Sequence, residues 1–502
     1  MKKNVKFLLA IAALSLVAFL TSCEKDEPKV DPIVEEGEQI IFDGNVIGNG
    51  SQEFEIKGTH TIKKGKYLLK GWVYITEGST LNIEPGTVIM GDKNTKAALI
   101  VERGGKLFAK GTVENPIVFT SNQPAGSRKP GDWGGLVICG KATNNKGEMI
   151  IEGGPRSKHG GSDDNDSSGE LSYVRIEFCG YPFRTDQEIN GLTMGSVGRG
   201  TKIEYVQVSY SNDDAFEWFG GTVNGKYLIA YNTWDDGFDT DAGFRGNIQF
   251  GLLVNHPRIA DISRSNGFES DNSSDAPNQQ PVTSPVFSNI TMIGAAIQDP
   301  GFTNTSAYIN GGVYNPDNGS KLGQHQAAVQ IRRGSNLSLF NSVAVGYPVG
   351  LMINNDKGSQ TQKAASDGLV NVKNVWFGAM SITGSDKDGS YKDSLSVNAS
   401  TFDKNAAESF SSSFFKEIAN KNHLYANASA LMLKNPANPS LPGSWAPLAA
   451  SPLLNQANLF TDSRLSNTFF DKVNFAGAFR SDAASDNWTL KWANFDPQNT
   501  IY

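Results

Sequence analysis

The stretch that decides the fold contains three segments that can be aligned with one another: Asp213-Asp214-Ala215-Phe216-Glu217-Trp218-Phe219, Asp235-Asp236-Gly237-Phe238-Asp239-Thr240-Asp241 and Ser265-Asn266-Gly267-Phe268-Glu269-Ser270-Asp271. The first two segments start 22 residues apart (213 to 235) and the second and third start 30 apart (235 to 265). A spacing in this range indicates stacked structural repeats rather than one globular core. We therefore expect a solenoid in this region.

Within the alignment, a phenylalanine recurs at positions 216, 238 and 268, and an acidic residue follows it each time. In stacked strands these phenylalanines form an internal ladder, and the period-2 alternation of a strand turns the following residues outward. The predicted outward column is Glu217, Asp239 and Glu269. A second, partial column adds Asp241 and Asp271.

Parallel rungs lie ~4.8 Å apart, so ionised carboxylates in one column repel one another unless a cation lies among them. Calcium prefers several carboxylate oxygens, and Glu217, Asp239, Asp241, Glu269 and Asp271 are the predicted metal ligands. Retaining glycosidases place two carboxyl groups ~5 Å apart, so Glu217, Asp239 and Glu269 are the catalytic candidates if the protein is an enzyme. A solvated acidic face without a function is the third interpretation.

Other residues in or next to the three segments are further candidates. Asp214, Asp236 and Asn266 share the parity of the phenylalanines, so we expect them to point inward and bond backbone amides of the turns. Aromatic residues near the column could stack on sugar rings or cover the edge of a coil. These ligand-binding candidates are Trp218, Phe219 and Trp234.

Short alternating apolar runs separated by glycine-containing turns continue this pattern on both sides, for example Trp72-Val73-Tyr74-Ile75 and Leu99-Ile100-Val101. Strands this short and evenly punctuated favour a β-solenoid over a sandwich. Residues 73–120 resemble the opening coils of right-handed parallel β-helices of the pectate-lyase-like type. The expected fold class is an all-β, right-handed parallel β-helix with long loops at residues 272–285, 298–324 and 355–368.

The chain changes character near residue 401. Phe410, Phe414, Phe415 and Ile418 recur at helical spacing, and the tail is rich in aromatic residues, as expected of a cap over the last coil. We therefore expect four parts: a lipoprotein signal peptide at 1–22, a lipidated flexible tether at 23–45, a parallel β-helix at 46–400, and a C-terminal helix and aromatic-rich cap at 401–502.

The N-terminus has a basic segment at residues 1–6 and an apolar segment at 7–20 of signal-peptide length. Leu20-Thr21-Ser22-Cys23 resembles a lipobox, which implies lipidation of Cys23 and attachment to a membrane. Glu24-Lys25-Asp26-Glu27 resembles the tag that exports lipoproteins to the cell surface of some Gram-negative bacteria. The expected location is the outer membrane, exposed on the cell surface. An ordinary signal peptide with a chance cysteine is the alternative.

The formal net charge of −7 argues against a nucleic-acid partner, which needs basic patches. Cys139 and Cys179 both end apolar runs, and we expect them to be small buried residues on adjacent rungs, although an export compartment would also permit a disulfide. The polar segment 162–169 must be a loop, either solvated or calcium-binding. The chain has no nucleophile elbow, phosphate loop or dinucleotide fingerprint.

Asp235-Asp236-Gly237-Phe238-Asp239 resembles part of the calcium-binding region of some β-helical pectate lyases, which pair calcium with a lysine base. None of the nearby cations, Lys226, Arg245, Arg258 and Arg264, can be matched to that base. Most of the chain after the signal peptide resembles a family of functionally uncharacterised β-helical surface lipoproteins of Gram-negative bacteria. The resemblance rests on the lipobox, residues 73–120, 131–138 and 235–243, and the closing Trp492-Ala493-Asn494-Phe495-Asp496-Pro497.

The leading hypothesis is a non-catalytic surface lipoprotein that binds glycan or another extracellular nutrient through the loop face of the β-helix. Its expected partners are a polysaccharide or an outer-membrane transport protein, and calcium is the expected cofactor. The first alternative is a calcium-dependent polysaccharide lyase or glycoside hydrolase. The second is an adhesive or structural surface protein.

Overall fold

The computed structural model describes residues 42–502 except 185–186, 275–276, 394, 399–400 and 404–407. The chain divides into two units at residue 40, and all described residues belong to the second unit. The expected signal peptide, the lipidated Cys23 and most of the tether lie outside the described residues. Among the described residues, no helix is both long and apolar enough to cross a membrane.

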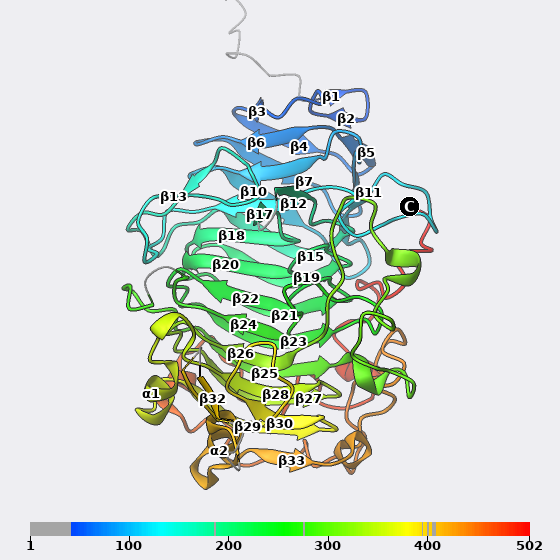
Figure 1. The fold of residues 1–502 in the computed structure, drawn as a ribbon. Coiled ribbons are helices and arrows are strands. Elements are labelled where there is room, and N and C mark those ends of the chain that lie inside the picture. The colour runs from blue at the N-terminus through cyan, green and yellow to red at the C-terminus, as the bar shows by residue number, and fades with distance from the viewer. Residues whose placement is uncertain (1–41, 185–186, 275–276, 394, 399–400, 404–407) are drawn as a thin grey trace, which may run out of the picture. The chain divides into compact units, whose positions relative to one another are not determined.

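Two long sheets, called A and B, run side by side through the stack of coils, and their main strands pair in parallel (Figure 1). The described part of sheet B contains 11 strands. Its strands are, in order, β3 (Phe54–Ile56), β6 (Trp72–Ile75), β9 (Ala98–Val101), β12 (Gly135–Cys139), β18 (Leu192–Val197), β20 (Phe216–Gly221), β22 (Phe238–Asp241), β24 (Phe268–Ser270), β26 (Ala327–Ile331), β28 (Val349–Ile353) and β30 (Ile382–Ser385). This is the expected right-handed parallel β-helix.

Sheet A contains 16 strands in the described residues. Its main path is β1 (Phe42–Asp43), β2 (Val46–Ile47), β5 (Lys66–Leu69), β8 (Val88–Gly91), β11 (Ile117–Ser121), β15 (Gly169–Glu177), β19 (Lys202–Ser209), β21 (Asn224–Tyr231), β23 (Asn247–Val254), β25 (Val286–Ile293), β27 (Ser338–Val345), β29 (Asn371–Gly378) and β33 (His423–Tyr425). A short branch holds β4 (Thr59–Ile62), β7 (Thr80–Ile83) and β10 (Lys106–Lys110).

A line of left-handed residues bends sheet A along its length. The first half of β15 pairs with β10 and its second half pairs with β11, with Tyr173 between the two paired segments. Because a left-handed residue interrupts an extended strand, each long strand of sheet A turns a corner there. The equivalent residues, with φ between 52° and 62°, are Tyr173, Tyr205, Tyr227, Phe250, Asn289, Asn341 and Asn374. Each coil therefore has three faces, one in sheet B and two in sheet A.

The register of sheet B confirms the alignment of the three sequence segments. Phe216 pairs with Phe238, and Phe238 pairs with Phe268. All three side chains are fully buried in the main core, with ring centroids 5.5 and 5.3 Å apart. The phenylalanine ladder therefore sets the register of these coils, as the sequence predicts.

The ends and insertions of the coils carry the remaining elements. These are β13 (Met149–Ile150), β14 (Lys158–His159), β16 (Pro182–Arg184), β17 (Gln187–Glu188), α1 (Thr361–Ser366), β31 (Leu395–Asn398), β32 (Thr401–Asp403), α2 (Phe410–Lys416) and short 3-10 turns. In the polar loop 162–169, Asp164 accepts hydrogen bonds from Thr143 and pairs with Arg245 at 3.3 Å. That acid therefore ties the loop to the coils.

The predicted C-terminal helix covers the last coil. Helix α2 begins after Ser409, whose side chain accepts a hydrogen bond from the Ser412 amide, the usual cap of a helix N-terminus. Phe414 and Phe415 are buried against the core, and Phe415 stacks on Phe377 with ring centroids 4.1 Å apart. Sheet A continues past this helix through β33, so the expected end of the β-helix at residue 400 does not coincide with the last strand.

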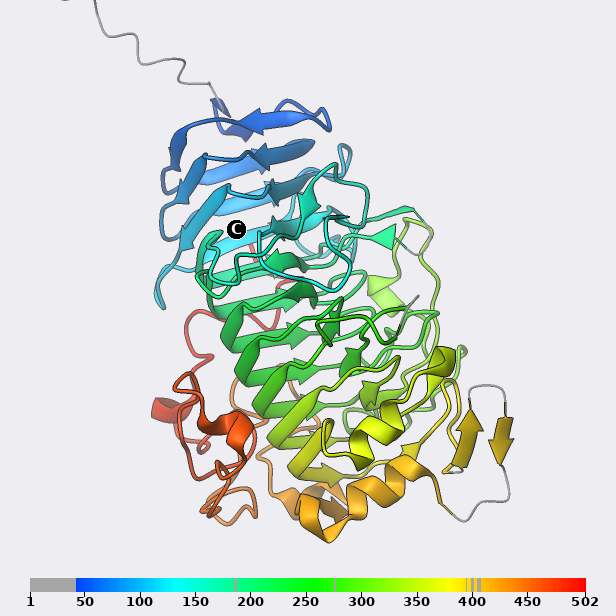
Figure 2. The same ribbon diagram turned by 90° about the vertical axis from the view of Figure 1, so that its left-hand side faces the viewer.

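The expected position of the aromatic tail, over the end of the stack, is wrong. The tail instead covers the outer face of sheet A (Figure 2). Gln207 and Gln249, both fully buried, each donate to and accept from the backbone of one tail residue, Asn494 and Asp471 respectively. The tail reaches back to the early coils, where the Tyr502 hydroxyl bonds the Glu177 carboxylate at 2.6 Å. An apolar outer face needs such a cover because its side chains otherwise remain in water.

The two described cysteines are buried and free. Their burial agrees with the prediction, but they are not stacked on adjacent rungs. Cys139 ends β12 in sheet B, whereas Cys179 follows β15 in sheet A.

Candidate functional site

A cavity of about 820 Å³ lies on the outer face of sheet B, over β20, β22 and β24. We call it the acidic pocket. Turns before the strands, the insertion at 141–169, the β16–β17 hairpin and the loop at 298–324 all contribute to its wall. Its acidic residues are Glu152, Glu188, Asp213, Asp214, Glu217, Asp235, Asp236, Asp239, Asp241, Asp261, Glu269 and Asp271.

The predicted acidic column is part of this pocket. Glu217 pairs with Asp239, and Asp239 pairs with Glu269, across β20, β22 and β24. Their neighbours in each strand, the phenylalanines, point into the core, so the acids point outward, as predicted. Asp241 and Asp271 also line the pocket. The structure thus places all five predicted metal ligands in one pocket, but only Glu217, Asp239 and Glu269 belong to groups of closely spaced oxygens.

Asp214, Asp236 and Asn266 form the predicted polar ladder, but the prediction that they point inward is wrong for the two acids, because their carboxylates line the acidic pocket. The Asp236 amide donates to the Asp214 carboxylate at 2.8 Å, and the Asn266 amide donates to the Asp236 carboxylate at 2.5 Å. The ladder extends one rung each way, since Asn190 accepts from the Asp214 amide and Asn266 accepts from the Ala327 amide. These side chains therefore hold the turns in register while they line the pocket.

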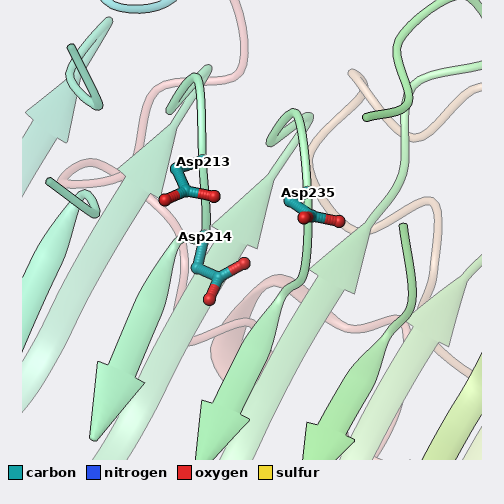
Figure 3. A group of neighbouring side chains, drawn as sticks. All are labelled: Asp213, Asp214 and Asp235. Atoms are coloured by element: carbon teal, nitrogen blue, oxygen red, sulfur yellow. The ribbon is translucent and has the colours of Figure 1, made fainter. Parts of the chain in front are cut away.

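Three overlapping groups of acids bring carboxylate oxygens within 4.8 Å of one another. Figure 3 shows the first, with Asp213 and Asp214 on one turn and Asp235 on the next. The other two groups are Asp214, Glu217 and Asp239, and Asp236, Asp239 and Glu269. Because the groups share Asp214 and Asp239, the oxygens form a continuous patch across three coils. Such a set of hard oxygen donors suits a divalent cation.

Two arginines that the sequence reasoning missed compensate one end of the patch. Arg332 pairs with Glu269 and also with Asp271 at 2.9 Å, and Arg333 pairs with Asp271 at 2.7 Å. Strand β26 is the next rung of sheet B, with Val329 opposite Phe268. Arg332 therefore occupies the position that Asp271 has in the rung before. Aligning this fourth rung would have revealed the arginine.

The other end of the patch has no such compensation. In the described part of the chain, no lysine, arginine or histidine forms an ion pair with the acids on the first two turns and strands. One carboxylate oxygen of Asp235 and one of Asp239 are buried without a hydrogen-bond partner. Unpaired buried charge is costly, so the site favours either proton or cation binding. The uncompensated acids are Asp213, Asp214, Glu217, Asp235, Asp236 and Asp239.

Burial is the main cause of the raised pKa values in this patch, and repulsion between the carboxylates adds to it. Both effects raise the pKa of Asp213, Asp214, Glu217, Asp235, Asp236 and Asp239 well above the usual range. Burial beside Glu188 and Asp241 raises the pKa of Glu152 to about 8. Burial raises the pKa of Glu269 to about 7 against the opposing effect of Arg332. A bound cation would reverse these shifts.

The ligand-binding aromatics are placed differently from the prediction. Trp218 and Trp234 are only 1% and 0% exposed and belong to apolar cores, so their predicted contact with a ligand is wrong. Trp218 shares the parity of Phe216, and the same alternation that turns Glu217 outward turns this indole inward. Phe219 does line the pocket. Phe183, from the β16–β17 hairpin, also lines it and was missed.

The cations that lie near the column in sequence lie elsewhere in the structure. Lys226 pairs with Asp471 of the tail, Arg245 with Asp164, and Arg264 with Asp388. Asp213 and Asp235, by contrast, share the outward parity of Glu217 and Asp239 and could have been predicted as ligands. Glu152, Glu188 and Asp261 come from insertions and turns, for which the sequence carries no periodic signal.

A comparison with models of protein families agrees with this architecture. A family model for the pectate-lyase like beta helix domain matches residues 54–414, which include every residue that lines the acidic pocket. The crystal structure of the pectate lyase Pel9A is similar at a TM-score of 0.35 and 13% identity, covering 81% of this chain and 89% of that chain. The catalytic unit of the GH87 alpha-1,3-glucanase from Streptomyces thermodiastaticus has a TM-score of 0.33 and 10% identity, covering 74% and 63%. No curated protein matches the sequence.

Proposed function

This chain belongs to the family of pectate-lyase-like β-helix domains, and we propose that its acidic pocket binds calcium and, through calcium, a carboxylate-bearing polysaccharide. The observation that carries the proposal is the patch of carboxylates in which three groups place their oxygens within 4.8 Å of one another. Within the described residues, Glu269 is the one member of these groups that has an ion pair. The unpartnered oxygens of Asp235 and Asp239 support it.

Calcium suits this donor set better than a softer metal would. It takes six to eight oxygen ligands in flexible geometry, and the patch offers carboxylate oxygens with no cysteine or histidine among the residues that line it. Asp214, Glu217 and Asp239, whose oxygens form one of the three groups, are the residues that would hold it. Carboxylate or hydroxyl oxygens of a sugar could complete the coordination.

The polysaccharide part of the proposal rests on the size and charge of the pocket. A cavity of about 820 Å³ accommodates several sugar rings, since sites for small ligands span ~300–1,000 Å³. Without a cation, a pocket with so many carboxylates repels an acidic glycan. With calcium bound, and with Arg332 and Arg333 at one end, it attracts one. Binding of an acidic glycan therefore depends on calcium.

Calorimetry of the full chain with calcium chloride, and then with polygalacturonate, tests this proposal. We expect saturable calcium binding, and polygalacturonate binding that EDTA abolishes. Asp239→Asn is expected to weaken calcium binding at least ~10-fold, whereas Asp482→Asn in the tail leaves it unchanged. If calcium does not bind, the proposal is wrong. If calcium binds but the polymer does not, the cation has a structural role only.

A second candidate function is cleavage of the polysaccharide, which Lys321 favours. This exposed lysine lies at the rim of the acidic pocket and, within the described residues, forms no ion pair. A lyase needs a base to remove a proton beside the sugar carboxylate. An unsaturated product from polygalacturonate and calcium, lost in both Lys321→Ala and Asp239→Asn, would establish this function over binding alone. A hydrolase acting through Glu217 and Asp239 would instead give a saturated product with a new reducing end.

The proposed location is the bacterial cell surface, with the chain attached to the outer membrane by lipid on Cys23. The support is the lipobox-like sequence Leu20-Thr21-Ser22-Cys23. Metabolic labelling with a fatty-acid analogue tests it, since Cys23→Ser must abolish the label. Protease accessibility in intact cells then separates the outer face from the inner face.

A further inference from the structure

A second cavity of about 580 Å³ shares no lining residue with the acidic pocket. We call it the tyrosine pocket. It is formed by the ends of β19 and β21, the turn at 256–258, the loop at 298–314 and two pieces of the tail. Its lining residues are Tyr210, Tyr231, Asn232, His256, Pro257, Arg258, Gln298, Asp299, Tyr308, Tyr314, Ala437, Asn438, Pro439, Ser440, Phe495 and Asp496.

Aromatic rings form the apolar part of its wall. Tyr210 and Tyr314 stack with ring centroids 4.4 Å apart, and Tyr231 contacts Phe495 edge-on at 5.2 Å. The guanidinium of Arg258 lies 3.8 Å from the ring centroid of Tyr308. Tyr308 and Tyr314 are partly exposed. Flat, partly exposed rings of this kind suit the C–H faces of a sugar.

Polar groups of both kinds surround these rings. Asn232 donates to the Tyr210 hydroxyl, which donates to the Tyr314 hydroxyl, each at 3.0 Å. The side-chain oxygen of Asn232, a residue 4% exposed, has no hydrogen-bond partner. In the described part of the protein, Arg258 forms no ion pair. Donors and acceptors placed around aromatic rings suit sugar hydroxyls, which are both donors and acceptors.

The charges of the two pockets differ in kind. The tyrosine pocket has one arginine and two aspartates, Arg258, Asp299 and Asp496. Asp299 already accepts a hydrogen bond from the Tyr308 hydroxyl, and Asp496 accepts one from Asn499 at 2.9 Å. No group of clustered acids in this pocket needs a cation. A ligand here is therefore bound by stacking and hydrogen bonds, independently of calcium.

We infer that the tyrosine pocket is a second carbohydrate site, which takes neutral sugar residues without a divalent cation. The long loop between Gln298 and Gln324 supports this arrangement, because it lines both pockets: Asp299 and Tyr308 line one, and Asn318 and Lys321 line the other. The tail closes the site through Phe495 and Pro439. The inference does not depend on the proposed calcium site.

Calorimetry of the full chain in EDTA, with maltohexaose, cellohexaose and xylohexaose as separate probes, tests the inference. At least one of them is expected to bind saturably. Tyr308→Ala and Arg258→Gln are each expected to weaken that binding at least ~10-fold, since aromatic and arginine contacts carry most of the energy of such sites. Tyr391→Ala, a partly exposed tyrosine outside both pockets, is the matched control and is expected to bind normally.

The melting temperatures of the same variants show whether they are folded, because each folded variant is expected to melt close to Tyr391→Ala. The inference is overturned if none of the three probes binds, if binding requires calcium, or if Tyr308→Ala and Arg258→Gln bind as well as Tyr391→Ala does. Sugar binding in EDTA with no calcium binding at all would contradict the proposed function but support the second site.

Discussion

The outer faces of sheets A and B belong to the same coils, but one is covered by the tail and the other forms an open pocket. Sheet B presents carboxylates to an open pocket of about 820 Å³. Sheet A presents aromatic, aliphatic and amide side chains, which the tail covers over the strands from β15 to β29. An apolar face gains stability when it is covered, whereas carboxylates without ion pairs favour the binding of a proton or a cation. The outward side chains of a solenoid face thus decide whether that face forms a ligand site or is covered by another part of the chain. We call the contact between sheet A and the tail the seam.

Removal of an anchor of the tail is expected to have the largest effect on this contrast. Trp492 is fully buried and contacts Tyr173 and Tyr205 edge-on, with ring centroids 6.0 Å away. Trp492→Ala is expected to lower the free energy of unfolding by ~3–5 kcal/mol, measured by denaturant unfolding. Phe469→Ala, on a partly exposed residue of the same tail, is the control. Equal losses in both variants would show that the seam is not anchored at Trp492.

Loss of the compensating arginine is expected to have the next largest effect. Arg332→Gln leaves Glu269 without its ion pair and weakens the compensation of Asp271. We expect the variant to be destabilised by ~3 kcal/mol in EDTA and largely restored by calcium, measured as a shift in melting temperature. Arg333→Gln is expected to cost less, since Arg332 still pairs with Asp271. If calcium does not reverse the destabilisation, Arg332 and the bound cation do not compensate the same carboxylates.

The pH dependence of stability distinguishes the two faces without a mutation. Several carboxylates of the acidic pocket have raised pKa values in the folded protein, for example about 8 for Glu152 and about 7 for Asp241. The folded state therefore binds more protons than the unfolded state between pH ~4 and pH ~8, and stability falls as pH rises through that window. In EDTA we expect a loss of roughly 2 kcal/mol from pH 5 to pH 8.

Calcium is expected to remove most of this loss at pH 8 and to have little effect at pH 5, where protons occupy the carboxylates. Melting curves at the two pH values, with EDTA and with calcium, measure both effects. The same stability at both pH values in EDTA would contradict the raised pKa values of the pocket.

The smallest effect is expected from the loss of one pair of hydrogen bonds between sheet A and the tail. Gln249 donates to the Asp471 carbonyl and accepts from the Asp471 amide, each at 2.8 Å. Gln249→Ala is expected to cost ~1–2 kcal/mol, measured by denaturant unfolding. Gln52→Ala, on an exposed residue, should cost nothing measurable. No loss in Gln249→Ala would mean that burial of the aromatic side chains alone holds the tail.

Much of the fold and part of the site could be predicted from local periodicity. The aligned phenylalanines predict the register of β20, β22 and β24, and the same alternation predicts the outward direction of Glu217, Asp239 and Glu269. The error at Trp218 came from setting that alternation aside in favour of a possible sugar contact. Asp213 and Asp235 were within reach of the same rule.

The compensation of the site could not be predicted from those three segments. Arg332 lies 61 residues after Asp271 (332 − 271), beyond the long loop that separates their rungs. Its place beside the acids follows from the pairing of β24 with β26. Glu152 and Asp261 reach the pocket on an insertion and a turn, where no period relates one residue to the next.

By itself, the sequence determined the coil, its register and the direction of the acidic column. These depend on residues close in the chain, because strand alternation and repeat spacing are local properties. Only the tertiary structure decided which acids lack an ion pair, which face is sealed by the tail, and that one loop lines two pockets. Those features depend on contacts between residues far apart in the chain, and no local pattern specifies them.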